Sequence, residues 1–112
     1  MLQICGIKAC DSMKKAFARL DAACVAYAFQ DFKKMPPSAE QISFWLAHLP
    51  ADQLVNRQGT TWRQLSPEAQ AALLDKAALT ALLIAKPSLI KRPLLIHNEQ
   101  VTVGLNSPLL PA

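Results

Sequence analysis

The sequence has little of what marks a nucleic-acid-binding module, namely a dense basic stripe with interleaved aromatic residues. Only 6% of its residues are aromatic, and although the formal net charge is +4, no basic run is longer than a pair. This balance suits a small anionic substrate as well as a polyanion. We therefore do not expect nucleic acid as a partner.

Long hydrophobic runs are also missing. The most apolar stretch, residues 71–85, is interrupted by Asp75 and Lys76 and could not span a bilayer comfortably. Near the start, Lys8 and Asp11 interrupt the apolar residues, which excludes the pattern of a secretory leader. We expect no membrane anchor.

Cysteine and histidine are scarce, and none has the spacing of a metal site or a dithiol pair. The three cysteines cannot all pair within the chain, which favours a reducing, cytoplasmic compartment. Cys5 and Cys24 are expected to be inert packing residues, as most buried cysteines are. Cys10 has Met13 where a CxxC partner would stand. The two histidines lie far from any paired cysteine, so no metal site is predicted.

The hydrophobic pattern predicts an opening β–α–β unit. Residues 2–5 form a short apolar run before Gly6, which is typical of a buried strand ending in a turn. From Asp11 onward the apolar residues recur at helical spacing. Residues 25–29 then resemble a second strand. Two strands joined by a helix usually lie parallel in one sheet.

The rest of the chain predicts a mainly helical insertion at about 38–86, followed by a β-hairpin. Ser38 could cap the first of its helices, and Asp75 could divide the later helical region in two. Residues 55–65 look like a loop around Gly59. The segment 93–104 has two apolar runs around a polar turn, which is a hairpin pattern. We predict one α/β domain over residues 1–112 with a small mixed sheet.

Cys10 stands where the first strand gives way to the first helix, in the stretch GIKACDSMKKAF. A helix N-terminus stabilises a thiolate by about 0.3–1 kcal/mol, and by up to roughly 2 kcal/mol in partly buried geometry. Lowering the pKa by two units needs about 2.7 kcal/mol, so nearby cations would have to supply the rest. Lys8, Lys14 and Lys15 could do so. Surface lysines with no such role are the plainer interpretation, and this stretch alone does not decide between them.

Three motifs together resemble one family. They are GIKACDSMKKA at residues 6–16, LVNRQGTTWRQL at 54–65 and PSLIKRPLL at 87–95. Their order and content are similar to the arsenate reductase family of thioredoxin-like proteins, the ArsC/Spx/YffB group, and most of all to its YffB-like branch. The resemblance implies a thioredoxin-like fold.

The resemblance also implies roles for individual residues. Cys10 would be the nucleophilic thiol, and Arg92 would hold an oxyanion beside it. The family's arginine precedes a cis proline, here Pro93, which would shape the substrate groove. A residue before proline is held extended, which would fix the direction of Arg92. Its guanidinium would offer a rigid fork of donors to an oxyanion or carboxylate.

The chain departs from true arsenate reductases at two anion-binding positions. A second arginine of that group aligns with Asn56, with Arg57 adjacent, and a third would fall near Leu105, where nothing basic stands. Asn56 and Arg57 are retained as candidate anion-binding residues, and a contribution from Arg57 or Arg63 stays open. These departures argue against arsenate itself as the substrate.

The resemblance implies a thiol oxidoreductase that uses one cysteine and glutathione as the second thiol. No bound cofactor is expected. Lys8, Lys14 and Arg92 would suit the two carboxylates of glutathione, and the substrate would be a disulfide or a small oxyanion. A glutaredoxin-type protein is a further candidate reductant. Two alternatives remain: a Spx-like protein-binding regulator without enzymatic activity, and a family member that has lost activity.

Overall fold

The computed structural model describes all 112 residues, and at its centre lies a mixed four-stranded sheet. The strands lie in the order β2-β1-β3-β4. Parallel pairing joins β1 to β2, whereas β3 is antiparallel to both β1 and β4. Their bounds are β1 (Leu2–Gly6), β2 (Tyr27–Asp31), β3 (Leu94–His97) and β4 (Gln100–Val103). The predicted α/β fold with a small mixed sheet and a parallel β–α–β opening is confirmed.

Helix α1 (Asp11–Ala22) connects the two parallel strands and buries Met13, Ala16 and Leu20. The second strand begins two residues later than the sequence suggested, at Tyr27 rather than residue 25. Cys24 adopts a left-handed backbone conformation with φ of 55° and ends the helix. The apolar residues just after it therefore belong to the turn, where Val25 N–H donates to Leu20 O at 3.0 Å.

Between β2 and β3 the chain is helical, and its helices begin at polar caps. Ser38 Oγ accepts from Gln41 N–H while Gln41 Oε1 accepts from Ser38 N–H, a reciprocal capping box. Asp75 caps the later helix, as predicted. The expected loop around Gly59 is partly wrong, because a short helix follows that glycine. The elements are α2 (Ala39–His48), α3 (Ala51–Leu54), α4 (Thr60–Arg63), α5 (Pro67–Gln70), η1 (Ala71–Leu74), α6 (Lys76–Ala85) and η2 (Pro87–Leu89).

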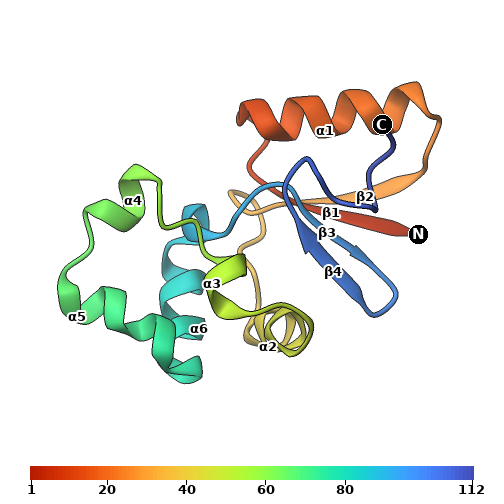
Figure 1. The fold of residues 1–112 in the computed structure, drawn as a ribbon. Helices are drawn as coiled ribbons and strands as arrows, with labels where there is room; N and C mark the ends of the chain where they lie inside the picture. Colours follow the sequence, from red (N-terminus) through yellow and green to blue (C-terminus); the bar gives the residue numbers. More distant parts are fainter.

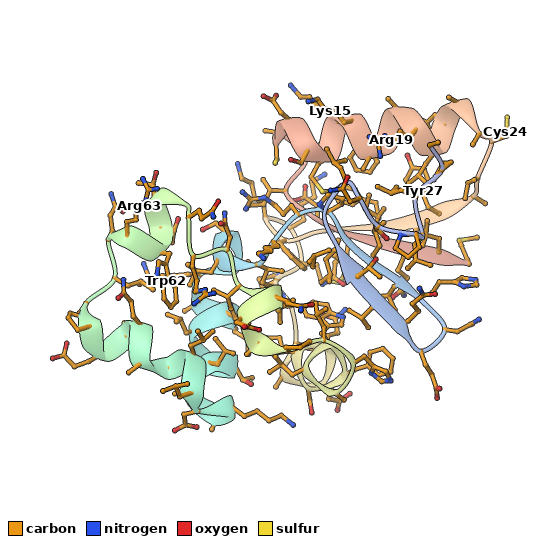
Figure 2. All side chains as sticks on the ribbon, in the orientation of Figure 1. Lys15, Arg19, Cys24, Tyr27, Trp62 and Arg63 are labelled. Atoms are coloured by element: carbon orange, nitrogen blue, oxygen red, sulfur yellow. The ribbon has the colours of Figure 1, made fainter.

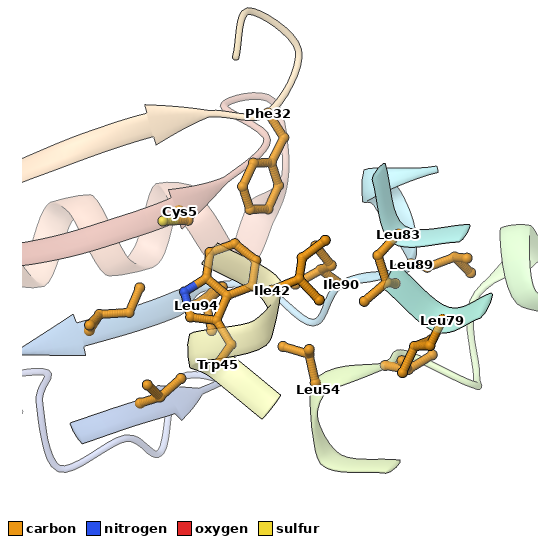
Figure 3. Close-up of a cluster of buried hydrophobic side chains, with 13 residues drawn as sticks. Cys5, Phe32, Ile42, Trp45, Leu54, Leu79, Leu83, Leu89, Ile90 and Leu94 are labelled. Carbon is orange, nitrogen blue, oxygen red and sulfur yellow. The ribbon is translucent and has the colours of Figure 1, made fainter. Parts of the chain in front are cut away.

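Hydrophobic side chains form two clusters on opposite faces of the sheet. Successive residues of a strand point to opposite faces, so Ile4 packs toward α1 whereas Cys5 joins the cluster that includes side chains of α2 and α6. Figure 1 shows α1 alone on one side of the sheet and the helical segment on the other, extending away from it. Figure 3 shows how Trp45 and Phe32 pack in the second cluster, with ring centroids 6.0 Å apart. None of the helices is both long enough and apolar enough to cross a membrane.

The C-terminal tail follows the predicted hairpin of β3 and β4 and folds back toward α1. Gly104 N–H donates to Pro93 O at 2.9 Å, which holds the start of the tail beside the residue after Arg92. Leu105 O accepts a 2.7 Å hydrogen bond from Arg19 of α1. Leu110 is buried in the cluster under α1. The tail has no regular secondary structure, as its prolines predicted.

Candidate thiol site

Cys10 is the N-cap residue of α1, with an extended backbone at φ −82° and ψ 138°. An N-cap side chain accepts hydrogen bonds from the N–H groups of the second and third helical residues. Here those residues are Ser12 and Met13. A thiolate at this position can therefore accept the hydrogen bonds that serine or aspartate accepts at other helix starts. The Cys10 side chain is partly exposed, so it is accessible to a reactant.

The surroundings of Cys10 lower the pKa of its thiol. Burial acts in the opposite direction and is the largest single influence, but it is outweighed by several groups that favour the thiolate. These are, in order, the Met13 N–H, the Arg92 side chain as a hydrogen-bond donor, the Ser12 N–H and the positive charge of Arg92. Arg92 is therefore the cation among the groups that favour the thiolate, and no lysine is one of these groups.

Arg92 is held in place from the helical segment. One terminal nitrogen, NH1, donates to Ser88 O at 3.1 Å, and the Ser88 hydroxyl lies 3.1 Å from that of Thr61. The motif around Gly59 and the motif before β3 are thus linked through two hydroxyls. Nε of Arg92 is buried and has no hydrogen-bond partner. Because the guanidinium has five N–H donors and a buried one is unused, Arg92 has donor capacity left for an anion.

A cavity of about 350 Å³ contains Cys10 and Arg92, and Asn56 lines it as well. Three of the residues predicted from the sequence are therefore close together. Four further residues line the same cavity and were missed: Ser12, Lys91, Val103 and Gly104. Ser12 could have been found from its position two residues after the N-cap cysteine, and Lys91 from its place beside Arg92. The peptide bond between Arg92 and Pro93 is cis, as the resemblance implied, and Pro93 is buried.

Other candidate residues lie outside that cavity. Arg57 lines a neighbouring cavity, and Lys8 lines another one near the end of β2. Lys14 is exposed on α1 and is not among the residues that line the thiol cavity. Arg63 is exposed at the end of α4, away from α1 in Figure 2. Asn56 uses Oδ1 to accept the Gln58 N–H at 3.1 Å, so part of its hydrogen-bonding capacity shapes its own turn.

The other two thiols are differently placed. Cys5 is buried in β1, and burial raises the pKa of its thiol to about 12, which fits the expected packing role. The interpretation of Cys24 as a packing residue is wrong, because it is exposed. Figure 2 shows Cys24 at the far end of α1. Twelve helical residues separate the ends of α1, or about 18 Å at 1.5 Å per residue.

The sheet order, the helix after β1 and the cysteine at its N-terminus together define a thioredoxin-like thiol protein. Comparison with known proteins identifies the family: residues 5–109 match the model of the ArsC family, and the chain belongs to it. This confirms the resemblance that the three motifs indicated.

Individual relatives agree with this assignment. The solved structure of the YffB protein is 41% identical, with a TM-score of 0.86 over 93% of this chain and 90% of that one. An arsenate reductase (ArsC) related protein from Brucella melitensis is 39% identical, with a TM-score of 0.76 over 96% and 88% of the two chains. An uncharacterized protein of Haemophilus influenzae is 30% identical over 95% of this chain and 92% of its own length.

Proposed function

We propose that this chain is a thiol oxidoreductase in which Cys10 is the only working cysteine and glutathione is the second thiol. The observation that carries the proposal is the placement of a partly exposed Cys10 at the N-cap of α1 beside Arg92, where its pKa is lowered. At neutral pH such a thiol has a larger thiolate fraction than an ordinary cysteine, and the thiolate is the nucleophile.

The need for an external thiol follows from the positions of the other cysteines. Cys5 points into the hydrophobic cluster on the opposite face of the sheet from α1. Cys24 lies beyond the other end of α1, whereas a disulfide requires Cα atoms within about 7 Å. Met13, at the position of a CxxC partner, carries no thiol. No second cysteine of the chain can therefore resolve an adduct on Cys10.

The proposed reaction is thiol–disulfide exchange in two steps. The Cys10 thiolate attacks the glutathione sulfur of a mixed disulfide between glutathione and a substrate thiol, forming a Cys10–glutathione disulfide and releasing the substrate thiolate, which takes a proton from solvent. A glutathione thiolate then attacks that disulfide, which yields oxidised glutathione and regenerates the Cys10 thiolate. In the net reaction, one free glutathione thiol is oxidised for each substrate thiol released, and the two glutathione sulfurs end in the disulfide of oxidised glutathione.

Arg92 would act in both steps. Its charge and its donors stabilise the thiolate that attacks in the first step and leaves in the second. Its buried Nε also supports the binding of an anionic group, either a carboxylate or a small oxyanion. Gly104 lines the cavity on the β3 side, and buried Pro93, which accepts the Gly104 N–H, would shape the groove from behind it.

The test is adduct formation with oxidised glutathione, located by mass spectrometry. The Cys24→Ser protein serves as the parent, because exposed Cys24 would otherwise react as well. We expect an adduct on Cys10 whose formation is slowed in Arg92→Ala and lost in Cys10→Ser. A Cys10 that forms no adduct would refute the proposal, as would one that reacts no faster than Cys24 does in a single Cys10→Ser variant that retains Cys24. A protein-binding role of the Spx type and a family member that has lost activity would then be the remaining interpretations.

A further inference from the structure

A second cavity of about 350 Å³ adjoins the thiol cavity, and its lining carries charges of both signs. Arg57 and Lys91 supply two positive charges, Asp52 supplies a negative one, and Asn56 and Gln58 add amides. Asn56 and Lys91 also line the cavity of Cys10. The two cavities therefore adjoin, and Asn56 and Lys91 form their shared wall.

The wall between the cavities is held by the backbone. Val55 and Ile90 form an isolated antiparallel bridge. On either side of it, Asn56 N–H donates to Leu89 O at 2.7 Å and Lys91 N–H donates to Leu54 O at 2.9 Å. The four apolar residues of this bridge are at most 1% exposed. Asn56 and Lys91 thus rest on a packed part of the core, and little ordering is required when a ligand binds.

We propose that this cavity binds the α-amino-acid group at the γ-glutamyl end of glutathione while the glutathione sulfur lies at Cys10. The proposal rests on the proposed function. The γ-glutamyl end carries a carboxylate and an ammonium group on one carbon atom. Arg57 and Lys91 would receive the carboxylate, and Asp52 would receive the ammonium group. An arginine fork and carboxylates form the stronger, charge-assisted type of hydrogen bond.

The charges favour this end of glutathione over the glycyl end. The glycyl end carries a carboxylate and no ammonium group. In this cavity the glycyl carboxylate could also pair with Arg57 and Lys91, but Asp52 would be left without a cationic partner from the ligand. An extended tripeptide spans at most about 10 Å, and the two cavities share Asn56 and Lys91 as lining residues.

Two other cavities fit the same ligand less well. The larger one, of about 470 Å³, contains Lys33 and Lys86 but no carboxylate. The cavity lined by Lys8, Asp31 and Lys34 has both charge signs, but Asp31 Oδ1 already accepts the Lys33 N–H at 3.0 Å. Neither shares a lining residue with the thiol cavity. A ligand whose sulfur lies at Cys10 therefore reaches the cavity of Arg57 most directly.

The experiment compares three thiols as reductants of a preformed mixed disulfide on Cys10. These are glutathione, γ-glutamylcysteine and cysteinylglycine, which lacks the γ-glutamyl group. We expect the first two to react at similar rates and cysteinylglycine to react about fivefold to tenfold more slowly at equal thiolate concentration, a difference of about 1 kcal/mol. Rates should be extrapolated to zero salt, because screening weakens exposed charge pairs.

Two variants with matched controls assign the effect to the cavity. Arg57→Gln and Asp52→Asn should each remove most of the preference for γ-glutamyl thiols, measured as the ratio of the rate with γ-glutamylcysteine to the rate with cysteinylglycine. Arg63→Gln and Glu68→Gln are the controls, since both residues are exposed and line neither cavity. Glu68 also matches Asp52 in lying in the first turn of a four-residue helix.

The outcomes separate this inference from the proposed function. If Cys10 exchanges with all three thiols equally, the γ-glutamyl site is refuted and the oxidoreductase proposal stands. The same holds if the control variants lose the preference as strongly as Arg57→Gln does. If Cys10 forms no mixed disulfide with any of the thiols, the proposed function itself fails.

Discussion

Gly6, the last residue of β1, lies against two residues of the thiol site. A Cβ atom placed there would stand 2.6 Å from Sδ and 3.0 Å from Cε of Met13, and 3.4 Å from Cγ of Arg92. Ordinary carbon contacts are about 3.5–4.0 Å, so the end of the Met13 side chain would have to move by roughly 1 Å. Met13 is fully buried and has little free space in which to move. Gly6→Ala should therefore destabilise the fold.

The loss of unfolding free energy in Gly6→Ala depends on two opposing contributions. Overpacking a close-packed core costs about 1–3 kcal/mol, and the flexible methionine favours the lower half of that range. Replacing glycine by alanine restricts the unfolded chain and stabilises the fold by about 0.4–1 kcal/mol where the backbone permits it. The φ of Gly6 is not in the left-handed region, so this gain applies. The net expected loss is about 1 kcal/mol.

Removing the Met13 side chain should make Gly6→Ala stabilising rather than destabilising. In a Met13→Ala background, Gly6→Ala no longer meets Sδ or Cε, so only the stabilising contribution of about 0.4–1 kcal/mol remains. Met13→Ala alone should cost about 2–5 kcal/mol because it leaves a cavity. A Met13→Leu background offers a gentler second comparison if the alanine variant is too unstable to measure.

The assay is urea denaturation of the four proteins of this cycle under reducing conditions, with thermal melting as a second measurement. A loss of 1 kcal/mol lowers Tm by roughly 4–8 °C in a domain of about this size. The expected coupling between the two sites is about 1–3 kcal/mol. Additive effects, equal within about 0.5 kcal/mol in both backgrounds, would show that Gly6 is not needed for the approach of Met13.

Three further changes test the site and its scaffold. Arg92→Ala should move the midpoint of Cys10 alkylation to higher pH, because it removes a hydrogen-bond donor and a positive charge that lower the thiol pKa. Lys14→Ala should leave the midpoint unchanged, and equal shifts in the two variants would contradict the role given to Arg92. Ser38→Ala should lower the free energy of unfolding by about 0.5–2 kcal/mol in urea titrations, because the capping box of α2 is lost, and no change would argue against that cap. Thr61→Val should lower the free energy of unfolding by about 0.5–1.5 kcal/mol, because the hydroxyl contact with Ser88 is lost. Adduct formation at Cys10 should also slow, because the Ser88 carbonyl holds Arg92. Normal adduct kinetics would rule out this link between Thr61 and Arg92.

Features set by local sequence were predictable. The caps at Ser38 and Asp75 precede apolar residues at helical spacing, and both helices begin where these residues indicate. The start of β2 was not predictable in the same way. Val25 is apolar and resembles a strand residue, but the strand begins where Tyr27 pairs with Leu2 of β1. That register depends on a neighbouring strand, which the local pattern does not contain.

In the thiol site too, features set by local sequence were predictable, whereas those set by contacts between distant segments were not. Cys10 was identified from its place between strand and helix, and its neighbours along α1 supply the N–H groups that lower its pKa. The lysines nearest to Cys10 in sequence were a poorer indication of which cation lowers its pKa, because consecutive helical residues point in directions about 100° apart. That Lys91 and Asn56 line the same cavity was not predictable, because the pairing of residues 54–56 with 89–91 is a contact between distant segments.

Met13 occupies the position that would hold a second thiol in a CxxC site. Its side chain fills the space above Gly6 and joins the cluster under α1. Its N–H group nevertheless faces Cys10 and lowers the thiol pKa. The residue thus contributes to thiolate stability through its backbone and to packing through its side chain. In the proposed reaction, release of an adduct from Cys10 requires a thiol that enters from solvent, and the charged cavity beside Cys10 is where we propose that this thiol is selected.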